Sequence, residues 1–198
     1  MTKQPSGFHQ MTRRMLLSLL ALLGLTGGVM AQTETNPAPA AEDLENVLVM
    51  ELSNGGTVKI GMRPDKAPKH VERIKQLARE GFYDGIIFHR VIEGFMAQGG
   101  DPTGTGMGGS KLPDLPAEFN DLPHVRGTAS MARAANPNSA NSQFFICFQP
   151  SFFLDGQYTV WGRVIEGMET VDAIERGEPP RNPTKIVKAY VAADAPAA

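Results

Sequence analysis

Cysteine is nearly missing from this 198-residue sequence. Cys147 is the only one, so the chain cannot form an internal disulfide, and cysteine pairing says nothing about its redox compartment. A large charge excess is also missing. The chain has 19 lysines and arginines and 21 aspartates and glutamates, and no basic run lies along its body. Nucleic acid is therefore not expected as a partner. Long helical periodicities are few, whereas 21 glycines and 15 prolines favour short strands joined by turns.

The motifs of several enzyme classes are missing as well. No HExxH, CxxC or GxSxG pattern occurs, and neither His89 nor His124 stands in such a context. A hydrolase or a metalloenzyme is poorly supported, and we expect no metal site. We expect His89 to be a packed, hydrogen-bonded residue and His124 to lie in a loop. Cys147 is expected to be a core residue and not a reactive thiol.

A nucleotide-binding interpretation also fails. Gly104, Gly106 and Gly109 have the spacing of a dinucleotide-binding fingerprint, which has to open a helix. Pro113 and Pro116 follow directly and are incompatible with that helix. We expect a tight loop beside a binding groove instead.

The N-terminus has the pattern of an export signal. Arg13 and Arg14 precede an apolar run over residues 15–25, which is too short to span a bilayer. Small residues follow, so the sequence predicts a signal peptide over 1–31, cleaved after Ala31. The paired arginines fit a twin-arginine signal, and the general secretory route stays open. Either route predicts a periplasmic protein without a stable membrane anchor; an uncleaved anchor is the less favoured alternative.

The remaining chain is expected to form a linker, one domain and a tail. Residues 32–46 are rich in Ala, Pro, Thr and Glu without periodicity, which predicts a disordered linker. The domain is expected over 47–192 and a flexible tail over 193–198. Inside the domain the patterns predict a hairpin of strands 47–52 and 57–62 across Ser53–Gly56, further strands over 127–131, 143–148, 158–164 and 185–192, and helices from Pro68 to Gly81 and over 168–176.

Short strands with brief connections predict an antiparallel barrel capped by two helices, a mainly β fold. The polar residues of the first helix, together with His70, are expected to be solvated; they are Lys69, Glu72, Arg73, Lys75 and Arg79.

The most informative stretch runs from Phe88 to Asp101 (FHRVIEGFMAQGGD). Its alternation is that of a strand and places Arg90 on a face with apolar neighbours. A guanidinium cannot lose its proton, so it needs acceptors or a substrate there. The run RVIEG recurs at Arg163 without the following FMxQGGD, so we interpret Arg163 as a strand residue facing solvent or a carboxylate.

Apolar and amide side chains are available to complete a site around Arg90. Phe95, Met96, Phe145 and Leu154 could wall a pocket for a compact apolar ring, and Gln98 and Gln143 could hold a peptide. Core packing is the simpler explanation for any single phenylalanine. The combination favours a binding site.

Several motifs together resemble the cyclophilin-type peptidyl-prolyl cis-trans isomerases. They are FHRVIxGFMxQGGD over 88–101, SMARA over 130–134, NSQFFI over 141–146, LDG over 154–156 and GRVIEGM over 162–168. The match runs from about Val47 to Val191. The resemblance implies a closed eight-stranded antiparallel barrel with two capping helices, no cofactor, and an X-Pro peptide as substrate in an outer groove.

The same resemblance assigns roles residue by residue. Arg90 matches the catalytic arginine, and Phe95, Met96, Phe145 and Leu154 match the proline pocket. Positions along the peptide groove are Gln98, Ala132, Arg133 and Gln143, with Gly104 in the loop that borders it. Arg133 is expected to act chiefly through its backbone.

Two positions depart from many eukaryotic members. Phe153 stands where they carry a tryptophan associated with tight cyclosporin binding, and Tyr158 where they carry histidine. We therefore expect retained isomerase activity with weak cyclosporin binding, while Glu93 should lie in an exposed turn and matter little. The expected partners are unfolded or flexible proline-containing polypeptides, and the protein is expected to be a monomer.

Two other functions stay open at this point. The first is a proline-peptide binding module or holdase chaperone without significant turnover. The second is a structural domain whose groove is vestigial. An intact arginine beside an intact pocket favours the enzyme, because a pure binder has no need of a donor for the prolyl nitrogen.

Overall fold

A hairpin starts the sheet, as the sequence predicts. β1 (Val47–Leu52) pairs antiparallel with β2 (Thr57–Met62), and Gly55 in the turn has a φ of 90°, which an L-residue rarely adopts. The computed structural model describes residues 43–195. The predicted signal peptide and most of the predicted linker lie outside these residues.

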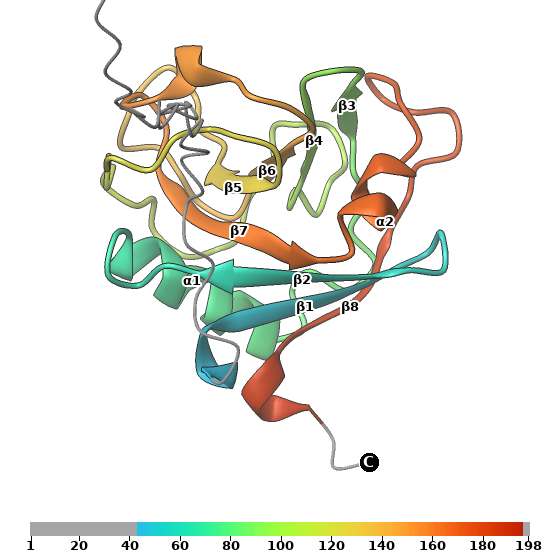
Figure 1. Ribbon diagram of the computed structural model, residues 1–198, viewed down its shortest axis with the longest axis horizontal. Coiled ribbons are helices and arrows are strands. Elements are labelled where there is room, and N and C mark those ends of the chain that lie inside the picture. Colours follow the sequence, from blue (N-terminus) through green and yellow to red (C-terminus); the bar gives the residue numbers. More distant parts are fainter. Residues whose placement is uncertain (1–42, 196–198) are drawn as a thin grey trace, which may run out of the picture. The chain divides into compact units, whose positions relative to one another are not determined.

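The described chain contains the following elements (Figure 1). They are a 3-10 turn at Leu44–Asn46, β1, β2, α1 (Pro68–Arg79), β3 (Arg90–Ile92), β4 (Met96–Gly99), β5 (Thr128–Met131), β6 (Phe144–Cys147), a 3-10 turn at Phe152–Leu154, β7 (Val160–Glu166), α2 (Met168–Asp172), β8 (Ile186–Val191) and a 3-10 turn at Ala192–Asp194. Ordered structure therefore begins three residues before the boundary predicted at Val47 and includes Asp194, which pairs with Arg79 at 2.7 Å.

The eight strands form one antiparallel sheet in the order β3-β4-β6-β5-β7-β2-β1-β8. The sheet is curled but open, so the expectation of a closed barrel is wrong: β3 and β8 are its two edges and share no ladder. Isolated bridges, such as Ile87 with Lys185, join the segments beside these edges. The proline-rich segment before β8 explains the opening, since Pro179, Pro180 and Pro183 have no N–H to extend a ladder.

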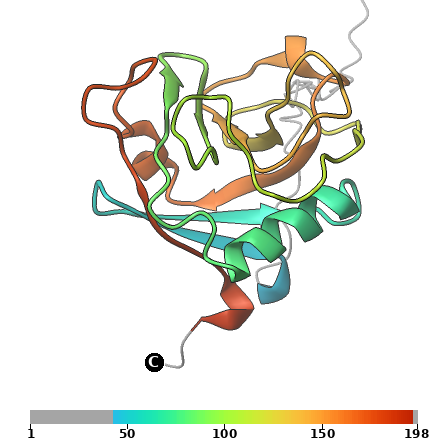
Figure 2. The same cartoon turned by 180° about the vertical axis from the view of Figure 1, so that it is seen from behind.

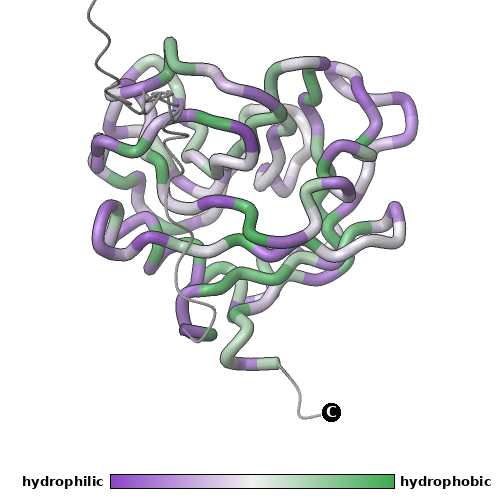
Figure 3. Tube along the Cα trace, viewed as in Figure 1, coloured by the Kyte–Doolittle hydropathy of each residue, from purple (hydrophilic) through white to green (hydrophobic). Residues whose placement is uncertain are grey.

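The side chains form two separate apolar clusters. The main core fills the inside of the curled sheet, where Phe144 makes edge-to-face contacts with Tyr83, Phe88 and Trp161. Along β1 the hydrophobic colour is nearly continuous (Figure 3). Because side chains alternate along a strand, Phe145 and Cys147 of β6 point away from this core into a second cluster with Met96 and Leu154.

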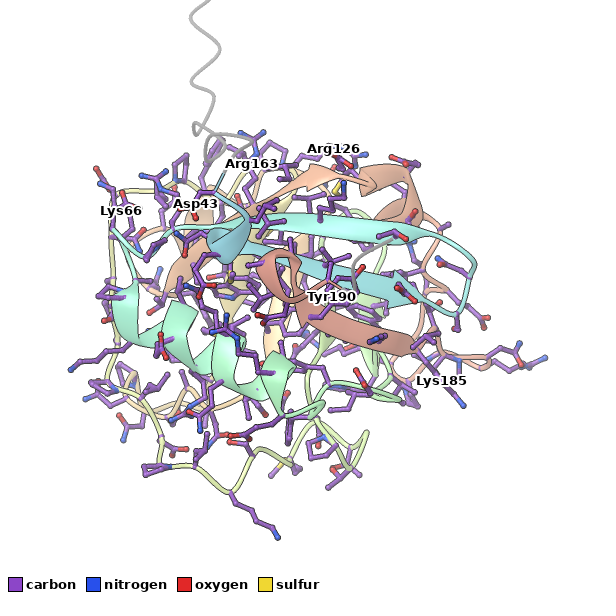
Figure 4. All side chains as sticks on the ribbon, turned by 90° about the horizontal axis from the view of Figure 1, so that it is seen from below. Asp43, Lys66, Arg126, Arg163, Lys185 and Tyr190 are labelled. Atoms are coloured by element: carbon purple, nitrogen blue, oxygen red, sulfur yellow. The ribbon has the colours of Figure 1, made fainter. Side chains whose placement is uncertain are left out.

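α1 packs against β8 (Figure 2); Lys185 directly precedes that strand and Tyr190 is its second-last residue (Figure 4). The expectation that the polar side of α1 is solvated is wrong at three positions, because His70, Arg73 and Lys75 are buried. Residues of the segment before β5 contact two of them: Glu118 bonds to His70 at 2.7 Å, and the Pro113 carbonyl accepts from Arg73 at 2.8 Å. Backbone carbonyls of an irregular segment need such donors. The third, Lys75, pairs with Glu45 at 3.2 Å.

The connections differ from the predictions at one point and agree with them at another. α2 ends at Asp172 and not at the predicted residue 176; the Arg176 guanidinium donates to the carbonyls of Asp172 and Ile174 beyond its end. Between β4 and β5 the structure has no helix, in agreement with the rejection of a nucleotide-binding motif. Within residues 43–195, no helix is long and apolar enough to cross a membrane.

Candidate functional site

A pocket of about 270 Å³ opens on the outer face of the sheet, over the second apolar cluster. Ten of the residues named from the sequence line it: Arg90, Phe95, Met96, Gln98, Ala132, Arg133, Phe145, Phe153, Leu154 and Tyr158. The other two lie beside it. Gln143 lines an adjoining groove of about 500 Å³, and Gly104 lines a third hollow that also includes Arg90 and Gln98.

Strand register brings these residues together across the sheet. Arg90 of β3 is opposite Gln98 of β4, and Gln98 is opposite Phe145 of β6. Directly opposite residues in an antiparallel ladder share a face. The cation, the amide and the aromatic ring therefore form a row on the outer surface.

Hydrogen bonds continue this row into the glycine loop. Arg90 donates from Nη1 to Gln98 Oε1 at 3.4 Å, and Gln98 Nε2 donates to Gln143 Oε1 at 2.9 Å. Gln143 Nε2 in turn donates to the carbonyls of Gly106 and Gly108 at 3.0 and 2.8 Å. Each amide is thereby held in one orientation, since reversing it would place a donor against a donor.

The Arg90 guanidinium also has an ionic partner. Its Nε lies 2.8 Å from Oε2 of Glu178, and the two side chains are 42% and 54% exposed. Arginine has five N–H donors. Two of them are used by Glu178 and Gln98, which leaves Nη hydrogens for a ligand in the pocket.

The floor of the pocket is aromatic. The Phe145 ring stacks on His124, with centroids 6.1 Å apart, and meets the edge of Tyr158 at 5.8 Å. Phe95 packs against Phe153 at 5.6 Å, and Phe153 is 66% exposed at the rim. A compact apolar ring would be desolvated on this floor without losing hydrogen bonds.

The side chain of Arg133 contacts residues at the pocket wall. Its guanidinium lies over the Tyr158 ring at 4.5 Å and donates to the Gln157 carbonyl at 2.8 Å. These contacts hold Tyr158 at the pocket wall, a role that the sequence did not indicate. The expected backbone role of Arg133 stays a prediction.

His124 was expected only to lie in a loop, and it does, but it is fully buried and supports Phe145. Its Nδ1 lies 2.7 Å from Asp155 Oδ1, and its Nε2 lies 3.1 Å from Ser130 Oγ. Burial lowers the pKa of His124, although Asp155 opposes this effect. No local pattern in the sequence connects His124 with Asp155.

Asp101 organises the glycine loop. It is almost fully buried and accepts from the backbone N–H groups of Thr103 at 2.7 Å and Gly106 at 2.6 Å. Burial by itself would raise the pKa of this carboxyl, but the hydrogen bonds outweigh it and hold the pKa at about 2. The groove wall is therefore built around a buried carboxylate.

Two titratable residues are absent from the lining of the 270 Å³ pocket. Cys147 is buried, as predicted, and burial raises its pKa to about 12, so its thiol is unreactive at neutral pH. His89 is buried, but the expectation that it is hydrogen-bonded is wrong, since neither ring nitrogen has a partner. Across residues 43–195, no group of three or more His, Cys, Asp or Glu side chains could hold a metal ion.

Comparison with a family model and with curated proteins leads to the same family, the cyclophilin-type peptidyl-prolyl cis-trans isomerases. The family model "Cyclophilin type peptidyl-prolyl cis-trans isomerase/CLD" matches residues 47–191. A "Probable peptidyl-prolyl cis-trans isomerase" of Brucella suis is 52% identical over 171 residues, which cover 78% of this chain and 87% of that protein. A peptidyl-prolyl cis-trans isomerase of Synechococcus elongatus is 45% identical over 125 residues, covering 62% of this chain and 85% of the relative.

Solved structures show the same likeness. Cyclophilin AquaCyp293 from Hirschia baltica has a TM-score of 0.72 at 32% identity, covering 78% of this chain and 76% of that one. A cyclophilin type peptidyl-prolyl cis-trans isomerase of Cryptosporidium parvum, crystallised in the presence of the dipeptide Ala-Pro, has a TM-score of 0.68 at 31% identity. That likeness covers 73% of this chain and 98% of the other.

Proposed function

Because the chain belongs to the cyclophilin-type peptidyl-prolyl cis-trans isomerase family, we propose that Arg90 and the adjoining apolar pocket are the site at which it rotates X-Pro peptide bonds. The observation that carries this assignment is a guanidinium with unused donors beside an aromatic-floored pocket of about 270 Å³. The pocket suits a prolyl ring, which is apolar and compact.

Rotation about an X-Pro bond has to abolish amide resonance, against a barrier of about 18–20 kcal/mol. In the twisted transition state the prolyl nitrogen becomes pyramidal and regains a lone pair. An Nη–H of Arg90 directed at that lone pair stabilises the twisted amide more than either planar isomer. Such differential stabilisation is what catalysis requires.

Arg90 does not act alone in this account. One preorganised donor contributes about 3–4 kcal/mol, whereas an acceleration of about 10⁵ requires about 7 kcal/mol. The pocket formed by Phe95, Met96, Phe145 and Leu154 anchors the prolyl ring. Gln98 and the Ala132–Arg133 backbone hold the flanking chain, so that rotation occurs about one bond.

The apolar walls contribute through desolvation. Phe145 is 5% exposed and Met96 is 1% exposed, so the bound amide leaves water on this side. The twisted amide is less polar than the planar one. Loss of water therefore raises the free energy of the twisted amide less than that of the planar amide. No group has to titrate in this mechanism, so the rate should change little with pH near neutrality.

We also propose the setting in which the enzyme works. Arg13, Arg14 and the apolar run 15–25 support export, with cleavage after Ala31 and proline-containing polypeptides of the periplasm as substrates. Sequencing the mature N-terminus from fractionated cells tests this proposal. A mature chain that begins at residue 32 supports export, and a retained Met1 in the cytoplasm contradicts it.

Exchange spectroscopy on an X-Pro peptide tests the enzymatic function itself. The wild-type protein at substoichiometric concentration should bring cis and trans signals into exchange, since the uncatalysed reaction takes tens to hundreds of seconds. Peptide-induced shifts at Phe95 and Phe145 without faster exchange would identify a binding module or holdase. The absence of both would identify a vestigial groove.

A further inference from the structure

The loop after α2 is fastened to the free edge of β3, next to Arg90. Gly177 and Val91 exchange two backbone hydrogen bonds of 2.9 and 2.8 Å, which form an isolated antiparallel bridge. Gly177 has a φ of 149°, and a Cβ there would lie 2.6 Å from Pro180 Cα. Glycine is therefore needed for the tight turn that the loop makes between Gly177 and Pro180.

Arg176 fastens the same loop through its side chain. Its Nε lies 2.8 Å from Oε2 of Glu93, and its guanidinium lies over the Phe148 ring at 4.2 Å. Glu93, expected to matter little, is thus an anchor for this loop. With Arg176 and Gly177 fixed on its N-terminal side, Glu178 is held beside β3.

Glu178 reaches Arg90 from this position. Oε2 of Glu178 lies 2.8 Å from Nε of Arg90, whereas the Gln98 contact to Nη1 is a longer 3.4 Å. Glu178 is the one carboxylate that pairs with Arg90 in the part of the chain that the structure describes. The charge-assisted contact is the stronger of the two.

We propose that Glu178 is a positioning residue for Arg90: its carboxylate holds Nε, so that the free Nη donors face the proline pocket. The inference rests on the catalytic role proposed for Arg90. A half-exposed arginine on a three-residue edge strand otherwise samples many rotamers, which costs side-chain entropy when the donor must be aimed. A donor aimed before the reaction requires no reorganisation during it.

The size of the effect follows from the exposure of the pair. Half-exposed ion pairs are worth up to about 1 kcal/mol, which corresponds to about fivefold in a rate. Glu178→Ala should lower the on-enzyme exchange rate at saturation about fivefold and change peptide affinity less than twofold. Glu178→Gln keeps an acceptor for Nε and should recover at least half of the lost rate.

Glu166→Ala is the matched control, since Glu166 is an exposed carboxylate in an ion pair with Lys59 at 2.7 Å and is absent from all three hollows. Its exchange rate should equal that of the wild type. An unchanged rate in Glu178→Ala would overturn the proposal. A Glu178→Gln rate as low as that of Glu178→Ala would also overturn it, because the acceptor alone is meant to suffice.

Two further measurements separate positioning from a general structural effect. The Arg90 Nε–H should exchange with water faster in Glu178→Ala than in Glu166→Ala, and equal rates would contradict the proposal. Adding Glu178→Ala to Arg90→Ala should cause no further loss of rate, because the two residues act as one unit. If Arg90→Ala lowers the rate and Glu178→Ala does not, this inference alone fails; if Arg90→Ala has no effect, the catalytic assignment fails.

Discussion

The Phe145 ring stacks on the His124 ring, with planes inclined by 16° and centroids 6.1 Å apart. His124 is itself held by Asp155 and Ser130. The floor of the pocket beside Arg90 therefore rests on a buried imidazole. Burial lowers its pKa below 6.5, so the ring is mainly uncharged at neutral pH.

Three buried histidines should make the fold sensitive to mild acid. Burial lowers the pKa of His70, His89 and His124 below 6.5, so the unfolded chain binds protons at a higher pH than the folded chain. Stability is then complete above pH 6.5 and is lost as the pH falls toward the folded pKa values. Denaturant titrations should show a loss of at most about 1.4 kcal/mol per pH unit for each histidine between pH 7 and 5.

A substitution measures how much His124 alone contributes to this pH dependence of stability. His124→Gln removes one titrating group. It should reduce the dependence of the unfolding free energy on pH between pH 7 and 5 by at most about 1.4 kcal/mol per pH unit. An unfolding free energy that is constant over this range in the wild type contradicts the account.

Asp101→Asn should loosen the glycine loop. The variant loses charge-assisted bonds to Thr103 and Gly106 and should lower the unfolding free energy by about 2 kcal/mol at pH 7. Because the Asp101 pKa is held at about 2, below its ordinary 3.8, its contribution is present above pH 3.8 and is lost as the pH falls through about 2. Guanidinium titrations at pH 7 and 3 test both statements, and equal stability of variant and wild type at pH 7 contradicts them.

Phe145→Ala should affect both stability and binding. The side chain is 5% exposed, so its removal should lower the unfolding free energy by about 3 kcal/mol. Loss of the pocket floor should weaken binding of a proline peptide about tenfold, or about 1.4 kcal/mol. Val187→Ala, at a residue 54% exposed on β8, is the control and should change neither quantity; unchanged affinity in Phe145→Ala would rule out this pocket.

Phe153→Trp should strengthen cyclosporin binding, which we expect to be weak in the wild type. Phe153 is 66% exposed at the pocket rim and packs on Phe95, so a larger ring can be accommodated there. Trp adds apolar area and an N–H donor, worth up to about tenfold in affinity. Calorimetry on both proteins measures this gain, and equal affinities would mean that the rim residue does not limit binding.

Local patterns predicted much of this molecule correctly. Asn54-Gly55 marked the hairpin, Pro68 and Gly81 bounded α1, and the strand predicted over 143–148 contains β6. The family resemblance identified all ten residues that line the pocket. These features depend on backbone preferences or on motifs that are each contiguous in the chain.

Contacts between distant segments could not be predicted in this way. Glu178 lies 88 positions from Arg90, and Glu118 lies 48 positions from His70. Nothing in the periodicity of α1 indicates that a proline-rich segment covers its polar side. The sheet edges at β3 and β8 likewise depend on the tertiary path of the chain.

The rate of prolyl rotation on the enzyme, measured by exchange spectroscopy with Arg90→Ala at saturating protein, tests the central claim most directly. Loss of a donor used only in the transition state should slow on-enzyme exchange by about 10²–10³-fold, or about 3–4 kcal/mol, while peptide affinity changes less than threefold. A variant that exchanges bound peptide as fast as the wild type would contradict the account.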